Sequence, residues 1–259
     1  MPAFFAHFQF GEQVLNKLDG DLKNILVENK KEFRMGLQGP DIFFFYKPWE
    51  KENDVVEYGH HLHETPAVWM FQRGLGNGRQ SDTYAYMMGV VCHFALDSTC
   101  HPYVAEFEKS VGVSHMEIES EFEKMLLRKA GKDPFTYRVD QLIPTDEYIS
   151  QTMYEFYHVY SAKKFHFALR WMQNFKQLFT EKSRIRLGLM NSVLTLTGFG
   201  KFKDQILQHK DNPLCEESNE KLYQLSLEAI PLALELMKEL DEVKQTGDPL
   251  SDKWYRNFV

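Results

Sequence analysis

The chain has 259 residues, 43% of them hydrophobic and 14% aromatic. This suffices for one large core, so we expect residues 1–259 to form a single domain. The formal net charge of -7 at pH 7 provides no basic surface for long-range attraction to nucleic acid or anionic lipid. No apolar run approaches the roughly 20 residues that cross a bilayer. The start, MPAFFAHFQFGEQ, lacks the features of a secretory signal, so we expect a cytoplasmic location.

The first predicted helix covers residues 11–33, where apolar side chains recur at three- and four-residue steps between charged ones. His7 lies just before this helix. The next segment, residues 34–46, reads RMGLQGPDIFFFY and has two glycines and a proline ahead of an aromatic run. We therefore expect Asp41 to lie in a turn that leads into a buried element. Core packing is the favoured role of the FFFY run, and a substrate cleft is the alternative.

Helix is predicted again over residues 66–73 and 81–99. The second of these is apolar on most sides, so we expect it to be central and buried. The segment HFALDSTCH begins in it, and its His93, Asp97 and His101 follow one another at intervals of four. This spacing places three side chains on one face of a helix. Burying two imidazoles and a carboxylate is costly, and a bound cation offsets that cost.

A capping box is predicted at the start of the next helix, because Ser114 is followed three residues later by Glu117. This helix runs to about residue 129. His115 and Glu119 lie in its first turns, as a second pair of potential ligands at an interval of four. An exposed ion pair is the competing interpretation of this pair.

Further helices are expected to begin near residues 145, 162, 181 and 217, the last with a kink at Pro231. His158, His166 and His209 have no carboxylate at ligand spacing in a comparable setting, so we expect them to be hydrogen-bonded or exposed. Since no segment alternates as a strand does, the sequence predicts an all-α fold, a single-domain multi-helix bundle.

Potential metal ligands are concentrated near the start of the chain. Seven of the ten histidines lie in the first 115 residues, among them the cluster His60, His61 and His63. The mixed nitrogen and oxygen donors suit Zn²⁺, with Mn²⁺ or Fe²⁺ as alternatives in a reducing compartment. The three cysteines contain no CxxC pair, and HExxH, phosphate-loop and nucleophile-elbow motifs are absent. The alternative to a metal site at His93 and Asp97 is a pair of side chains that are hydrogen-bonded to each other in the core.

The order of these motifs resembles the zinc-dependent phospholipase C family, which is related to the single-strand-specific zinc nucleases. The resemblance rests on His7, GPD at residues 39–41, the histidine cluster, HFALD and CHPY in the central segment, and HMEIE at residues 115–119. It implies an all-α fold and a hydrolytic activity that uses a di- or trinuclear metal cluster.

The resemblance also implies a set of eight metal ligands, all of them histidines or carboxylates within residues 7–119: His7, Asp41, His63, His93, Asp97, His101, His115 and Glu119. Asp97 would bridge two ions, one of them held also by His7 and the amino-terminal residue. Asp41 would in addition act as the base that activates the attacking water. Among the clustered histidines His63 is favoured, because Glu64 and Thr65 follow it, and His61 is the alternative.

The sequence therefore predicts a metal-dependent phosphoester hydrolase with two or three zinc ions that activate water. Its expected substrate is a phosphoester small molecule or a phospholipid, and the negative net charge argues against nucleic acid. The alternative hypothesis is a non-catalytic metal-binding or structural all-α protein that retains a relict site.

Overall fold

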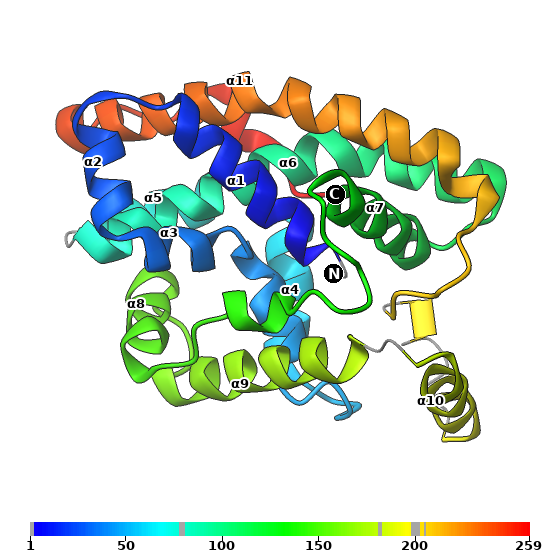
Figure 1. The fold of residues 1–259 in the computed structure, drawn as a ribbon. Helices are drawn as coiled ribbons and strands as arrows, with labels where there is room; N and C mark the ends of the chain where they lie inside the picture. The colour runs from blue at the N-terminus through cyan, green and yellow to red at the C-terminus, as the bar shows by residue number, and fades with distance from the viewer. Residues whose placement is uncertain (1–2, 78–80, 181–182, 198–202, 205) are drawn as a thin grey trace.

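The computed structural model describes residues 3–77, 81–180, 183–197, 203–204 and 206–259 (Figure 1). These residues form helices and connecting loops without a strand, which confirms the predicted all-α fold. The α-helices are α1 (Phe4–Lys17), α2 (Gly20–Glu28), α3 (Lys30–Gly36), α4 (Asp54–Glu64), α5 (Val68–Asn77), α6 (Ser81–Val111), α7 (His115–Lys129), α8 (Glu147–Tyr157), α9 (Ala162–Phe179), α10 (Arg184–Leu196) and α11 (Glu216–Thr246). The short 3₁₀ helices are η1 (Gly39–Phe45), η2 (Val139–Leu142), η4 (Pro213–Cys215) and η5 (Asp252–Tyr255).

Helix α6 is the central element. Every residue from Asp82 to Asp97 is buried, as the apolar character of this stretch predicts. Helices α3 and α11 pack against it, and α11 runs across the top of the view in Figure 1. The helix is longer than predicted, because it continues through Pro102 to Val111. None of the described helices has the length and apolar composition that a bilayer span requires.

Two glycines allow α3 and α6 to approach closely. A Cβ atom at Gly89 would lie 2.1 Å from the carbonyl oxygen of Phe33, and one at Gly36 would lie 2.0 Å from that of Tyr86. Neither contact is tolerable, so both positions require glycine. The close approach also brings the end of α3 to α6, where the carbonyl of Leu37 lies 3.1 Å from Nδ1 of His93.

The prediction of one helix over residues 11–33 is wrong. The apolar periodicity is real, but the segment belongs to α1, α2 and α3. Helix α1 ends at Leu18, whose backbone is extended, and α2 begins at Gly20, whose φ of 65° suits glycine. His7 therefore lies inside α1 rather than before a helix, which fixes the direction of its side chain.

Several other boundaries differ by a few residues. The helix predicted over residues 66–73 is α5, and the capping box predicted at Ser114 is present in part, since Ser114 Oγ accepts a hydrogen bond from the Glu117 N–H. The helices predicted near 145, 162 and 217 are α8, α9 and α11. The start predicted near residue 181 lies outside the described residues, and α10 begins at Arg184. Helix α11 contains Pro231 in its interior.

The last ten residues pack back onto the core. Trp254 and Phe258 are fully buried, and both rings contact Phe94 of α6. The N–H of Phe258 donates to the carbonyl of His63, at 3.0 Å. The end of the chain therefore lies against α4 and α6 at the point where these helices carry predicted ligands.

Candidate metal centre

The structure brings all eight predicted ligands together in three adjoining groups, although they come from five elements. The donor atoms of each group lie within 4.8 Å of one another. The groups are Asp41, His63 and His93; His7, His93 and Asp97; and His101, His115 and Glu119. His93 belongs to two of them, so the first two groups are contiguous.

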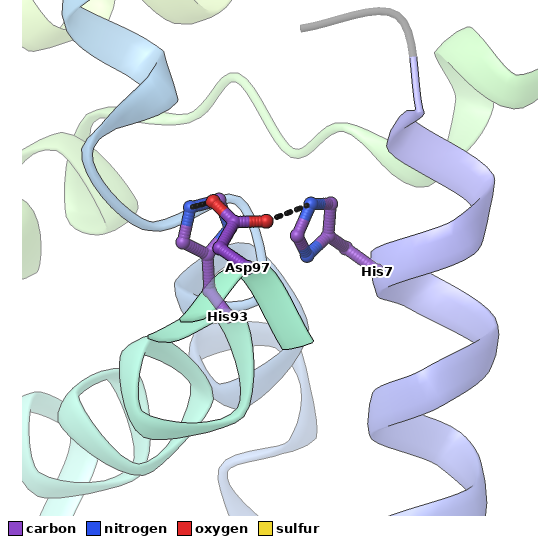
Figure 2. A group of neighbouring side chains, drawn as sticks. All are labelled: His7, His93 and Asp97. Atoms are coloured by element: carbon purple, nitrogen blue, oxygen red, sulfur yellow. Dashed lines mark ion pairs between the residues drawn. The ribbon is translucent and has the colours of Figure 1, made fainter. Parts of the chain in front are cut away.

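Asp97 joins the groups. Its Oδ2 lies 2.9 Å from Nε2 of His93, and its Oδ1 lies 3.3 Å from Nε2 of His7 (Figure 2). The same Oδ1 is 3.6 Å from Nε2 of His101, in the third group. Figure 2 shows α1 bringing His7 to the face of α6 that carries the other two side chains, and the rings of His7 and His93 stack at 4.2 Å.

Asp41 and His63 come from two further elements. Asp41 lies in η1, and its Oδ1 is 3.0 Å from Nε2 of His63 on α4. His63 is the buried member of the histidine cluster, whereas His60 and His61 are exposed. Gly39 makes this arrangement possible, because its φ is 45° and a Cβ there would lie 2.5 Å from the ring of His93.

The third group lies where α6 meets α7. Nε2 of His115 is 3.0 Å and Nε2 of His101 is 3.3 Å from Oε1 of Glu119. Glu119 and His101 are buried, while the side chain of His115 is 29% exposed. The pair at an interval of four is therefore not an isolated surface ion pair, since it faces a third donor from another helix.

Backbone carbonyls orient three of the imidazoles. Nδ1 of His63 lies 2.7 Å from the carbonyl of Gly59, and Nδ1 of His101 lies 2.5 Å from that of Phe258. Nδ1 of His93 faces Leu37 in the same way. With each Nδ1–H donating to a carbonyl, Nε2 is the atom that faces the carboxylates, and such outer hydrogen bonds are typical of metal-binding histidines.

The residues present fit a cation at this centre. Among the described residues, three buried ligand atoms of the groups have no hydrogen-bond partner: His7 Nδ1, Asp41 Oδ2 and Glu119 Oε2. His93 Nε2 and Asp97 Oδ2 face each other at 2.9 Å but do not form a hydrogen bond. Leaving a buried polar atom unsatisfied costs about 1–3 kcal/mol. Imidazole nitrogens with carboxylate oxygens are the donors that zinc prefers when thiolates are absent. Cys92 and Cys100, both buried thiols, belong to none of the groups.

The electrostatics keep the carboxylates ionised. Burial alone would raise the pKa of Asp97, but the neighbouring imidazoles, chiefly those of His101 and His93, hold it well below its usual range. Burial likewise acts to raise the pKa of Asp41, and His93 and His63 outweigh it, so that this pKa is also lowered. Both groups therefore offer anionic oxygens at neutral pH.

A large cavity adjoins the centre. Its volume is about 1150 Å³, and His63, His101 and His115 contribute to its wall. Much of the remaining wall is aromatic, made by Phe44, Phe45, Trp49, Trp171 and Phe175. The FFFY run is thus divided, since Phe43 packs in the core against Tyr157 and Phe165, while Phe44 and Phe45 line the cavity.

The histidines predicted to lie outside the centre do lie outside the three groups. His158 is exposed at the end of α8, where its φ is 51°. His209 stacks on Phe135 with the ring centroids 4.0 Å apart. His166 lies on α9. The amino-terminal residue that the resemblance adds as a ligand falls outside the described residues.

Two supporting residues were not predicted. The backbone carbonyl of Phe258 orients the imidazole of His101, although the two residues are 157 positions apart, and no local sequence pattern predicts such a contact. Glu123 accepts hydrogen bonds from the N–H groups of Phe5 and Ala6, at 2.9 and 3.3 Å, and so holds the start of α1 beside His7. Burial raises the pKa of Glu123 to about 7. Its interval of four from Glu119 was a usable signal, since both side chains share one face of α7.

The family model described as zinc-dependent phospholipase C matches residues 6–181, which include all eight predicted ligands. No curated protein sequence and no solved structure shows significant similarity to the chain.

Proposed function

The chain belongs to the zinc-dependent phospholipase C family, and from this premise we propose that it is a zinc-dependent phosphoester hydrolase with two or three metal sites. The observation that carries the proposal is the set of three adjoining groups, which include buried ligand atoms without a hydrogen-bond partner among the described residues, beside a cavity large enough for a substrate. A site of this kind with an adjoining cavity favours catalysis over a closed structural site.

The residues of the three groups would bind the metal ions, and one of them would also accept a proton. Asp41, His63 and His93 would hold one ion, His7 and Asp97 a second beside it, and His101, His115 and Glu119 a third, because the one free ring nitrogen of His93 can serve a single ion. Zinc bound there would supply Lewis acidity toward the phosphoryl oxygens and would lower the pKa of water. Asp41 has one oxygen on His63 and a second, Oδ2, without a partner among the described residues. That oxygen is the candidate to accept the proton of the attacking water.

The cavity wall favours a phosphodiester with an apolar part and a cationic part. Besides its aromatic side chains, the wall includes Glu50, Glu57 and Glu64, against one lysine, Lys51, among the residues that the structure describes. Carboxylates and aromatic faces both favour cations, whereas they repel the phosphates of a polynucleotide. We therefore propose a phospholipid with a choline or ethanolamine headgroup as substrate, in preference to nucleic acid.

Hydrolysis of a soluble p-nitrophenyl phosphodiester by the zinc-loaded protein tests the proposal. We expect turnover by the parent protein and a loss of about 10²–10⁴-fold in Asp41→Asn, the usual contribution of a general base. His209→Ala, outside the three groups, is the matched control and should retain activity. Zinc content measured on Asp41→Asn separates a missing base from a missing ligand.

Absence of turnover on the soluble ester and on phosphatidylcholine, in a preparation that contains its full zinc complement, would overturn the proposal. The non-catalytic metal-binding protein would then be the better interpretation. Full activity in Asp41→Asn would leave the hydrolase standing and would remove Asp41 as the base.

A further inference from the structure

Helix α10 carries an apolar face that the rest of the described chain does not cover. The four side chains of this face are 79%, 62%, 56% and 87% exposed, in the order Ile185, Leu189, Val193 and Leu196. Their spacing of three and four residues places them on one side of the helix. Figure 1 shows α10 standing apart from the bundle, at the lower right. It also lies outside residues 6–181, which the family model covers.

The opposite side of α10 attaches the helix to the protein. Leu187 is buried, and the side-chain amide of Asn191 donates to the side-chain oxygen of Gln208, at 3.1 Å. The exposed face is therefore the side turned away from the molecule. A helix on a protein surface normally exposes apolar side chains only singly. A continuous stripe of four exposed aliphatic side chains, opposite the buried face, is therefore unusual.

The charges of α10 differ from those of the whole chain. Between residues 183 and 197 there is no acidic residue, although the chain has a net charge of -7. Arg184 and Arg186 are exposed; by helical geometry Arg186 borders the apolar stripe next to Val193, whereas Arg184 lies toward the attached side, near Asn191. The absence of a basic surface, inferred from the net charge, therefore does not hold for this helix. An apolar stripe on a helix whose charged residues are basic is typical of helices that lie in a lipid interface.

The end of α10 lies at the cavity. Thr197, which follows Leu196, contributes to the cavity wall together with His63 and His115. Trp49 lines the same cavity and is 45% exposed, and indole rings favour the boundary between lipid and water. The apolar stripe thus ends beside the cavity that adjoins the metal centre.

We propose that the exposed face of α10 docks on a phospholipid surface and places the cavity over a lipid headgroup. This inference rests on the proposed function, because it concerns the surface that carries the substrate. A second copy of the chain fits less well: four side chains on one helix are few against the roughly 20–30 residues a side of a stable protein interface. No acidic residue of α10 would offset the arginines of a second copy packed against the same helix.

Flotation with vesicles tests the docking. The full-length zinc-loaded protein is mixed with vesicles of phosphatidylcholine, or of phosphatidylcholine with phosphatidylserine, and the bound fraction is measured. We expect binding to both and stronger, salt-sensitive binding to the second. The double variant Leu189→Gln with Leu196→Gln should lose on the order of tenfold or more in partitioning, since two side chains no longer enter the lipid. Glutamine retains helix propensity.

Leu214→Gln is the matched control, because Leu214 is 55% exposed and lies outside α10. It should bind vesicles as the parent does. Equal vesicle binding by the parent and the double variant would overturn the docking proposal, as would no binding by the parent. Self-association of the parent that the double variant loses would assign the stripe to a second copy and would also overturn it.

The lipid docking of α10 and the hydrolase activity can each be contradicted without the other. Turnover of a soluble phosphodiester by a parent protein that binds no vesicles would remove the docking and keep the hydrolase. Vesicle binding that depends on the α10 leucines, without turnover of any phosphoester, would remove the hydrolase and keep a lipid-docking helix.

Discussion

Asp97 is the residue on which the metal centre depends most, because its two oxygens contact imidazoles from all three groups. We expect Asp97→Asn to lose more than one zinc ion per chain, since an amide does not supply the charge that two cations require. Elemental analysis of the purified variant measures this. Asp82→Asn changes a buried aspartate of the same helix, outside the three groups, and should retain the metal. Loss of a single ion from Asp97→Asn would rule out bridging.

His101 predicts a pH dependence of zinc binding. Asp97 and Glu119 outweigh the effect of burial and raise the pKa of His101 to about 10 in the metal-free protein. The imidazole therefore carries a proton at pH 7.5, and zinc must displace it. Since protons compete below the raised pKa, zinc affinity at this group should rise with pH up to about 10 and fall about tenfold per unit below it.

Calorimetric zinc titrations of the metal-free protein, in buffers of different ionisation enthalpy, measure the released protons. We expect release of at least one proton at pH 7.5. Identical heats in all buffers would contradict a protonated His101.

The sequence predicted correctly which candidate ligands lie together when their relation depends only on their spacing along one helix. The intervals of four in HFALDSTCH and in HMEIE follow from helix geometry, so His93, Asp97 and His101 share a face as expected. The contacts of Phe258 and Glu123 depend on how distant segments pack, and one sequence carries little trace of them. Burial, rather than spacing, distinguishes His63 from His60 and His61.

At the scale of elements, the contact between α3 and α6 is the one that tolerates least change. Gly89→Ala would place a methyl group 2.1 Å from the carbonyl oxygen of Phe33, and the two helices would have to separate. We expect a loss of about 1–3 kcal/mol in the free energy of unfolding, as in other overpacked cores. Chemical denaturation measures it. Because Leu37 orients His93, zinc affinity should fall as well.

Gly188→Ala serves as the control for that substitution. A Cβ at Gly188 meets no atom within 4 Å, so alanine should be neutral or should stabilise α10 by up to about 1 kcal/mol. Equal effects of the two substitutions would show that backbone propensity, and not the helix contact, determines the result.

The predicted helix over residues 11–33 shows where periodicity fails. A three- and four-residue rhythm continues across α1, α2 and α3, because each helix turns an apolar face to the core. The hydrophobic periodicity alone does not reveal where one helix ends and the next begins in another direction. The breaks occur at Leu18 and at Asn29, and only Gly20 offered a local signal for them.

For the whole molecule, the proposed zinc ions would connect helices that are far apart in the sequence. The proposed ligands come from α1, η1, α4, α6 and α7. Removing zinc should therefore lower the melting temperature. At a thousandfold excess over Kd one site contributes about 4 kcal/mol. A chain of this size then loses roughly 10 °C. Thermal melts with and without a chelator measure this, and an unchanged transition in demonstrably metal-free protein would contradict it.

Fold class and family were predictable because both depend on features that the sequence states directly: helical periodicity throughout and an ordered series of motifs. The cavity and the exposed face of α10 were not. Both depend on which sides of the helices remain uncovered after packing, and the FFFY run illustrates this, since Phe43 faces the core and Phe44 faces the cavity.

The zinc content of the protein tests the proposed metal centre most directly. It is measured by elemental mass spectrometry after zinc loading and removal of excess metal. The three groups of donors predict two or three tightly bound ions per chain. A single ion would contradict the bridged cluster, and a content near zero would contradict a metal centre altogether.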